Sequence, residues 1–229
     1  MTSFDVKRKR AWWFAWIPAA ITLVLIVAIG TTSAVLLNQG LGTPLPKPTV
    51  GQVTELNWSS FSAEGIDYIE KSRRVRIDFA RPPVQAAAID LIGDGATTIG
   101  PSFHDDTDND YYLIINGGGE GHGGTWLTVS ELTVTSKNGL VTGIAALASG
   151  ALPFRDALAL LQGHSEEFGW APPDMTALFA EVEDATRAGT SYEFTFGPGD
   201  RLGFDISATA SCESTGFCVV QYDAAPRVG

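Results

Sequence analysis

A long uncharged segment lies near the amino terminus of this 229-residue chain. No ionisable side chain occurs between Ala11 and Pro46, and residues 12–29 (WWFAWIPAAITLVLIVAI) are almost wholly apolar. A helix over residues 11–37 is long enough to cross roughly 30 Å of hydrocarbon at about 1.5 Å per residue. The sequence therefore predicts one transmembrane helix, with membrane lipid as its partner.

The residues before this segment predict its orientation. Residues 1–10 form a basic tail, and short basic segments stay on the cytoplasmic side of a membrane. The residues that set this orientation are Lys7, Arg8, Lys9 and Arg10. We therefore expect a single-pass protein of the cell membrane, with a cytoplasmic amino terminus and an extracytoplasmic carboxyl-terminal domain.

A cleaved signal peptide is the alternative to a retained anchor. Thr32, Ser33 and Ala34 are small residues of the kind found at signal-peptidase sites. The apolar stretch over 12–29 is nevertheless longer than the roughly 7–15 apolar residues that a signal peptide usually has. This length favours a retained transmembrane helix.

Proline and glycine separate the apolar segment from the rest of the chain. Residues 40–51 read GLGTPLPKPTVG, in which the prolines and glycines oppose both helix and sheet. We expect residues 38–52 to form an extended stalk. Residues 53–229 then form one extracytoplasmic domain of ordinary size.

The part of the chain that follows the basic tail is strongly acidic. Beyond Arg10 it carries 11 basic and 25 acidic side chains, a formal charge of −14. A negative surface repels phosphate backbones, so a nucleic-acid partner is disfavoured.

Two cysteines, Cys212 and Cys218, are the only ones in the chain. The predicted location of the domain exposes them to an oxidising compartment, where paired cysteines form disulfides. We therefore predict a disulfide between Cys212 and Cys218. A pair of free thiols is the alternative.

Alternating apolar residues predict a mostly antiparallel sheet. Residues 75–79, 192–196 and 202–206 each place apolar side chains on one face, which is typical of half-buried strands. The alternation slips between Val129 and Leu132, which indicates a bulge or bend. Asn138-Gly139 is a strong turn signal. Further strands are predicted at 111–115, 140–147 and 219–222.

Two segments show helical periodicity instead. Apolar residues between Phe154 and Phe168 fall on one stripe, with Gly169 just past the end. A second helix should begin after an N-cap at Asp174 and stop at Gly189. The predicted fold class is thus α+β: an N-terminal transmembrane helix, then a mostly antiparallel sheet domain with a helical hairpin packed on one face.

An acidic run offers a candidate metal site. Asp106, Asp108 and Asp110 alternate as in a calcium loop, and carboxylate oxygens at this spacing can converge on a hard cation. The sixth and twelfth positions of an EF-hand loop, however, hold Tyr111 and Gly117. Calcium is therefore a candidate cofactor, and a solvated acidic turn is the alternative.

A glycine-rich loop follows between Gly117 and Gly124. Its spacing fits a dinucleotide fingerprint, but the residues after it read as a strand rather than a helix, which excludes that interpretation. The candidate ligand-facing residues of this loop are Gly119, Glu120, Gly121 and His122. A flexible hairpin loop is the alternative.

Catalytic signatures are weak. The only histidines are His104, His122 and His164, and no G-x-S-x-G elbow is present. No catalytic residue can be named. The sequence favours a non-enzymatic binding or accessory module of the cell envelope, with a protein or another envelope component as its partner. The alternatives are an envelope hydrolase that uses carboxylates or a bound metal, and a calcium-stabilised structural module.

Overall fold

The computed structural model describes residues 47–101, 110–118 and 123–227. Residues 47–229 make up one compact unit. The predicted basic tail and transmembrane helix, residues 1–10 and 11–37, lie outside the described residues. Among the helices that are described, none combines the length and the apolar character that crossing a membrane requires.

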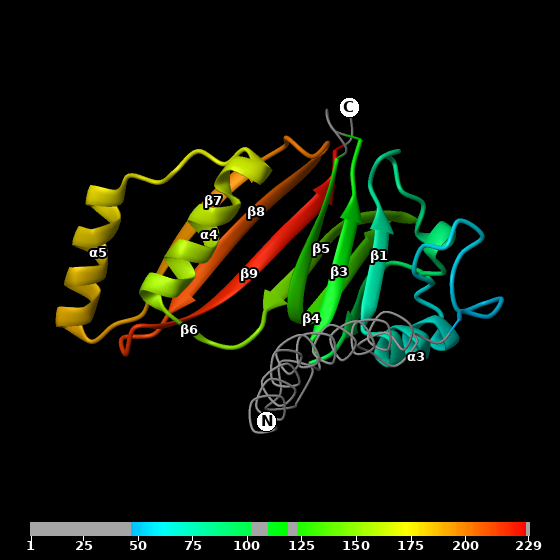
Figure 1. Ribbon diagram of the computed structural model, residues 1–229, viewed down its shortest axis with the longest axis horizontal. Coiled ribbons are helices and arrows are strands. Elements are labelled where there is room, and N and C mark those ends of the chain that lie inside the picture. Colours follow the sequence, from blue (N-terminus) through cyan, green and yellow to red (C-terminus); the bar gives the residue numbers. More distant parts are fainter. Residues whose placement is uncertain (1–46, 102–109, 119–122, 228–229) are drawn as a thin grey trace, which may run out of the picture. The chain divides into compact units, whose positions relative to one another are not determined.

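Nine strands of the described chain form one sheet (Figure 1). The order is β1-β3-β4-β5-β9-β8-β7, with β2 also paired to β4 and β6 to β9. Of these pairs, β1 with β3 is parallel and the rest are antiparallel. The predicted α+β class with a large antiparallel sheet is therefore confirmed. The strands are β1 (Arg74–Asp78), β2 (Gly95–Ile99), β3 (Tyr111–Asn116), β4 (Gly124–Lys137), β5 (Leu140–Ala148), β6 (Leu152–Pro153), β7 (Tyr192–Gly199), β8 (Phe204–Cys212) and β9 (Phe217–Pro226).

Strand β4 changes partners along its length. Its first part pairs with β3 through Val129, and its later part pairs with β2 from Leu132 onward. The register with β5 shifts between Val129 and Glu131. The bulge that the slipped alternation predicted is thus confirmed. The predicted turn at Asn138 and Gly139 joins β4 to β5, and both residues adopt the positive φ that such a tight turn needs (53° and 73°).

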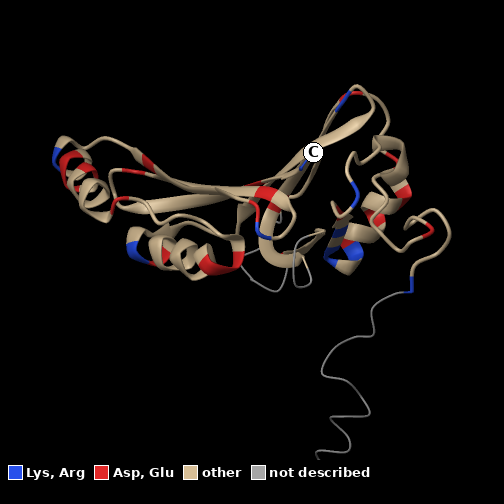
Figure 2. Ribbon diagram, turned by 90° about the horizontal axis from the view of Figure 1, so that it is seen from above, with Lys and Arg blue, Asp and Glu red and all other residues tan. Residues whose placement is uncertain are grey.

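Helices pack against the sheet at both ends of its strand order. Helix α4 (Phe154–Phe168) contacts β7, β8 and β9, and α5 (Met175–Ala188) contacts β7. Helix α3 (Ala63–Ser72) contacts β1, and the short 3-10 helix η1 (Ala86–Ile89) contacts β5. The largest side chains of the core are fully buried and include Phe79, Phe168, Phe196 and Phe204. Figure 2 shows α4 lying along one side of the neighbouring strands.

The caps of α4 and α5 agree with the sequence analysis. The Asp174 carboxylate accepts hydrogen bonds from the backbone N–H groups of Thr176 and Ala177 (2.9 and 3.2 Å), which satisfies donors that the first turn leaves unpaired. Gly169 and Gly189 end α4 and α5 in the left-handed conformation. Both predicted helices are confirmed, whereas α3 and β2 were not predicted.

The face of the sheet opposite to α4 is exposed to solvent. Side chains that alternate with the buried ones point to this face, and many are hydroxyls that pair across strands. Thr98 with Thr133, Thr135 with Thr142, and Thr195 with Thr209 approach to 2.9, 3.0 and 3.1 Å. Trp126 is 66% exposed and packs against Tyr112 on this face, with ring centroids 6.3 Å apart. The sheet therefore presents an uncovered surface that is mostly polar but carries exposed aromatic rings.

Candidate functional site

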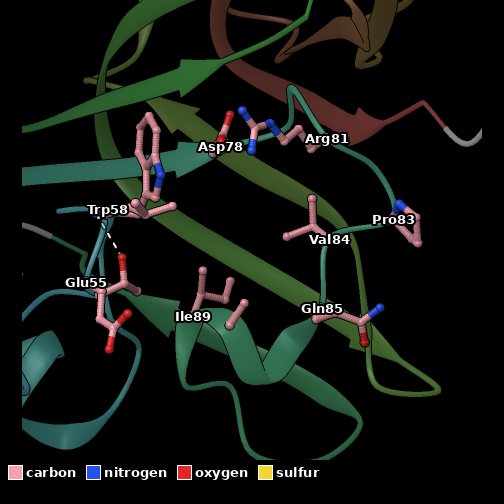
Figure 3. A pocket seen from close by; sticks show the side chains of 11 residues that line it. Glu55, Trp58, Asp78, Arg81, Pro83, Val84, Gln85 and Ile89 are labelled. Carbon is pink, nitrogen blue, oxygen red and sulfur yellow. Dashed lines mark hydrogen bonds between the residues drawn. The ribbon is translucent and has the colours of Figure 1, made fainter.

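A pocket of about 460 Å³ lies beside β1 (Figure 3). It is built from the loop 54–58, the end of β1, the loop 81–85 and η1. Its lining combines an indole, aliphatic side chains, two carboxylates and one guanidinium. Such a mixture of apolar walls and a few polar groups is typical of small-molecule sites.

A closed turn holds Trp58 at the pocket. The Thr54 hydroxyl accepts a hydrogen bond from the Trp58 backbone N–H (3.0 Å), and the Thr54 N–H donates to the Trp58 carbonyl (2.9 Å). Asn57 completes the turn in the left-handed conformation (φ 62°), which Asn tolerates better than most residues. The turn fixes a half-buried indole on the pocket wall.

Asp78 is held by two neutral donors. Its Oδ1 accepts a hydrogen bond from the Asn116 side chain (2.7 Å) and another from the Ala80 backbone N–H (3.1 Å). Asp78 and Asn116 are register partners at the ends of β1 and β3, so the parallel pairing of these strands brings the two side chains together. The carboxylate is therefore oriented without being neutralised by a cation.

Arg81 lies next to this carboxylate. Figure 3 shows its side chain extending from the loop after β1 toward Asp78. Arg81 is exposed, and it forms no hydrogen bond or ion pair with any residue that the structure describes. A guanidinium carries five N–H donors that match a planar anion. The pocket thus offers an unpaired cationic group beside an oriented carboxylate.

Apolar residues form the opposite wall of the pocket. Ile89 of η1 is 5% exposed, and Val84 packs against the core cluster. Pro83 and the more exposed Leu56 continue this wall. With Glu55 and Asp78 against Arg81, the lining has a formal charge of −1. The arrangement suits reversible binding of a small molecule that has both apolar and charged parts.

A second polar cluster lies between α4 and the sheet. The Thr125 hydroxyl donates to the Glu167 carboxylate (2.6 Å), and the Tyr222 hydroxyl lies 3.3 Å from Nδ1 of His164. Burial lowers the pKa of His164 below its usual 6.5, and the nearby Glu167 carboxylate partly offsets this. Burial, with a smaller contribution from Glu167, raises the pKa of Tyr222. Both groups are therefore neutral over a wide pH range around neutrality.

The open face of the sheet is hollowed by a groove of about 330 Å³ between β4–β5 and β8–β9. Thr135, Thr142 and Ser207 contribute hydroxyls to it, and Asp205 and Asp223 contribute carboxylates. Asp223 accepts a hydrogen bond from the Gln221 side chain (2.9 Å). The groove differs from the pocket beside β1 in having no aromatic side chain in its lining.

The predicted cation site lies mostly outside the described residues. Asp106 and Asp108 fall in the segment 102–109, whereas Asp110 is buried immediately before β3. Within 47–101, 110–118 and 123–227, no group of three or more His, Cys, Asp or Glu side chains is arranged to hold a metal ion. The calcium site therefore stays a prediction.

The predicted glycine loop and basic tail are also outside what the structure describes. Gly119, Glu120, Gly121 and His122 belong to the first, and Lys7, Arg8, Lys9 and Arg10 to the second. At the base of the loop the Gly117 N–H donates to the Gly123 carbonyl. A Cβ at Gly117 would lie 2.0 Å from the Leu202 carbonyl oxygen, so the close approach of the chain requires glycine there.

The cysteine pair agrees with the prediction. Cys212 and Cys218 are register partners at the hairpin end of β8 and β9, and their sulfur atoms are 1.99 Å apart, at disulfide distance.

The residues of the pocket were missed by the sequence analysis. Trp58, Asp78 and Arg81 come from separate segments, and no motif joins them. One signal was present: Arg81 lies two residues after the predicted strand 75–79 and directly precedes two prolines, an arrangement that presents a side chain in the loop at a strand end.

Comparison with known proteins adds no relative. The chain matches no protein-family model, no curated protein and no solved structure. Any function must therefore be argued from the residues themselves.

Proposed function

We propose that this chain is a single-pass, membrane-anchored binding module of the cell envelope. In this proposal residues 11–37 cross the membrane, residues 38–52 form a stalk, and the acidic α+β domain, with its helical hairpin on one face of the sheet, is displayed outside the cytoplasm. The observation that carries the proposal is the pocket beside β1, in which Arg81 has no partner among the described residues and Trp58 forms a wall.

The composition of the pocket supports binding rather than catalysis. Its apolar wall provides contact area, and burial of apolar ligand surface contributes about 25 cal/mol per Å². Its charged groups provide orientation, because an unpaired guanidinium and a fixed carboxylate each favour a ligand group of opposite charge. The lining contains no His, Ser or Cys, and Thr54 uses its hydroxyl oxygen to accept the Trp58 N–H. Small-ligand recognition is the function that this set of residues suits best.

Ligand-observed NMR on the full-length chain in detergent micelles tests the proposal. A panel of small envelope molecules, including sugars, amino acids and short peptides, is screened for saturation transfer from the protein. We expect at least one to bind, and Trp58→Ala to abolish that binding. Trp126→Ala is the matched control, since Trp126 is an exposed indole outside the pocket. Equal loss in both variants, or no binder in the panel, would count against a binding role for this pocket.

The membrane topology has its own test. A cysteine-free chain that carries a single new cysteine, either in the tail 1–10 or at Thr190, is labelled in intact cells with a membrane-impermeant maleimide. We expect labelling at Thr190→Cys and none in the tail. Labelling of the tail alone, or a chain that fractionates as freely soluble, would contradict the proposed topology.

A protein partner is a second candidate, favoured by the exposed ring pair on the open face. Trp126 is 66% exposed and Tyr112 46% exposed, and tryptophan and tyrosine are enriched among the residues that dominate protein interfaces. A photo-crosslinking residue at Thr128, which lies on the same strand and face, should capture this partner. Crosslinks that survive Trp126→Ala unchanged would argue against the ring pair as the contact.

Two alternatives from the sequence remain proposals. A calcium-stabilised module predicts that the melting temperature rises with calcium and falls with chelator, and that changing Asp106, Asp108 and Asp110 to Asn removes the difference. An envelope hydrolase that uses carboxylates or a bound metal predicts turnover that an Asp78→Asn or Glu55→Gln variant abolishes.

A further inference from the structure

We infer that the pocket beside β1 binds a zwitterionic ligand of the amino-acid type, with its carboxylate on Arg81 and its ammonium on Asp78. The apolar side chain of the ligand would lie against Trp58, Val84 and Ile89. This inference rests on the proposed function, because it names the class of ligand that the same pocket accepts.

Arg81 provides the anion-binding group. Its guanidinium has no partner among the described residues, so it is free to form two parallel hydrogen bonds to a carboxylate. Lysine would supply only a point charge here, whereas the guanidinium fork also fixes the orientation of a planar anion. A free carboxylate is the smallest ligand group that uses this geometry.

Asp78 provides the cation-binding group. Both of its hydrogen bonds go to Oδ1 and come from neutral donors, the Asn116 amide and the Ala80 N–H. The negative charge is therefore held in place but not compensated by a cation, and Oδ2 receives neither of these bonds. An ammonium group, with three N–H donors, fits an acceptor of this kind. The nearby indole of Trp58 adds a face that also attracts cations.

Two of the three charged groups in the pocket, Arg81 and Asp78, explain why one ligand should carry both signs; Glu55 is the third. Arg81 and Asp78 line the same pocket, yet no ion pair joins them. A ligand with only one charge would compensate one group and partly desolvate the other without a partner, which is unfavourable. A zwitterion compensates both groups in a single event.

The apolar wall selects the remainder of the ligand. Ile89 and Val84 are aliphatic, and Trp58 presents an aromatic surface at the same pocket. These side chains gain most from an aliphatic or aromatic substituent, because apolar area removed from water is favourable on both sides. Leucine and phenylalanine are therefore the probes that the pocket should prefer over glycine.

Calorimetric titration of the full-length chain in detergent micelles tests this inference. The probes are L-leucine, L-phenylalanine, glycine, N-acetyl-L-leucine without the ammonium, and L-leucinamide without the carboxylate. We expect leucine to bind roughly tenfold or more tightly than either neutralised analogue, since each loses hydrogen bonds to a charged group. Glycine should bind more weakly than leucine.

Three variants assign the charges to their residues. Arg81→Gln should remove the preference for leucine over leucinamide, and Asp78→Asn should remove the preference for leucine over N-acetylleucine. Arg74→Gln is the matched control, because Arg74 is an exposed guanidinium on β1 that does not line the pocket. Circular dichroism melting checks the Asp78 variant, whose side chain also holds Asn116. If that variant does not fold, the Arg81→Gln titrations decide alone.

The outcomes separate this inference from the proposed function. Equal binding of leucine and leucinamide, or a preference that survives Arg81→Gln, overturns the zwitterion. If no amino acid binds but another molecule of the NMR panel does, and does so through Trp58, the zwitterion is wrong and the pocket is still a ligand site. If nothing binds in either assay, both proposals fail.

Discussion

The disulfide allows a quantitative prediction about stability. Cys212 and Cys218 are six positions apart and face each other at the end of the β8–β9 hairpin. In the chain-entropy description, closing a loop of about seven residues removes roughly 8 cal/mol/K from the unfolded ensemble, or about 2.4 kcal/mol at 25 °C. For a domain of this size each kcal/mol corresponds to about 2–4 °C in melting temperature. Breaking the bond should therefore lower the melting temperature by about 5–10 °C.

Two perturbations separate the cross-link from its packing. Reduction leaves both sulfur atoms in the molecule, so the change on reduction reports the cross-link itself. Cys212→Ala with Cys218→Ala also removes two side chains that are 2% and 0% exposed, so it should lower the melting temperature further than reduction does. Because the sulfurs are buried, reduction is carried out in denaturant and the protein is refolded with thiol present.

The assay is thermal unfolding of the full-length chain in detergent, followed by circular dichroism in oxidised, reduced and double-alanine forms. The expected order of melting temperature is oxidised, then reduced, then double alanine. An oxidised and a reduced form that melt within about 1 °C of each other would refute the entropic reasoning. An order in which the reduced form is the most stable would refute it as well.

Three further predictions concern a histidine and two glycines. Burial keeps the pKa of His164 below 6.5, so as the pH falls the unfolded chain takes up a proton at this residue before the folded chain does. The contribution of His164 to the free energy of unfolding is therefore complete above pH 6.5 and is lost as the pH falls below it. His164→Gln should flatten that decline in urea titrations between about pH 7 and 5. Gly163→Ala should raise the free energy of unfolding by about 1 kcal/mol, because a Cβ there meets no atom within 4 Å and alanine is the better helix former. Gly199→Ala should lower the free energy of unfolding by about 1–3 kcal/mol or more, since its Cβ would lie 2.2 Å from the Phe168 carbonyl oxygen. Similar effects of the two glycine substitutions, measured in the same unfolding experiments, would contradict the packing argument.

The sequence predicted the elements whose signals are local. Tyr192, Phe194 and Phe196 alternate strictly and are all buried in β7, because a strand turns successive side chains to opposite faces. The N-cap at Asp174 and the helix end at Gly189 could also be predicted from the sequence, since each depends on contacts within one helical turn. Helix α3 gave no comparable pattern. It has only ten residues, fewer than three helical turns, so Ile66 and Ile69 give too short a repeat to indicate a helix.

The pocket could not be predicted from the sequence for a different physical reason. Asp78 and Asn116 are 38 positions apart and meet because β1 and β3 run parallel, a pairing that no local pattern indicates. Trp58 reaches the same place through a turn formed with Thr54. The sequence indicated candidate site residues in the acidic run, the glycine loop and the basic tail, together with the cysteine pair. Apart from Asp110 and the two cysteines, these residues fall outside the described part of the chain.

The position of β9 has a consequence for biosynthesis. This strand lies between β5 and β8 in the sheet, although it follows every other described strand in the sequence. Ala224 pairs with Ile144 on one side and with Ile206 on the other. The two halves of the sheet therefore cannot join until β9 has been synthesised and inserts between β5 and β8. Until then β5 and β8 each lack one neighbouring strand, and an unpaired strand edge is open to pairing with another chain.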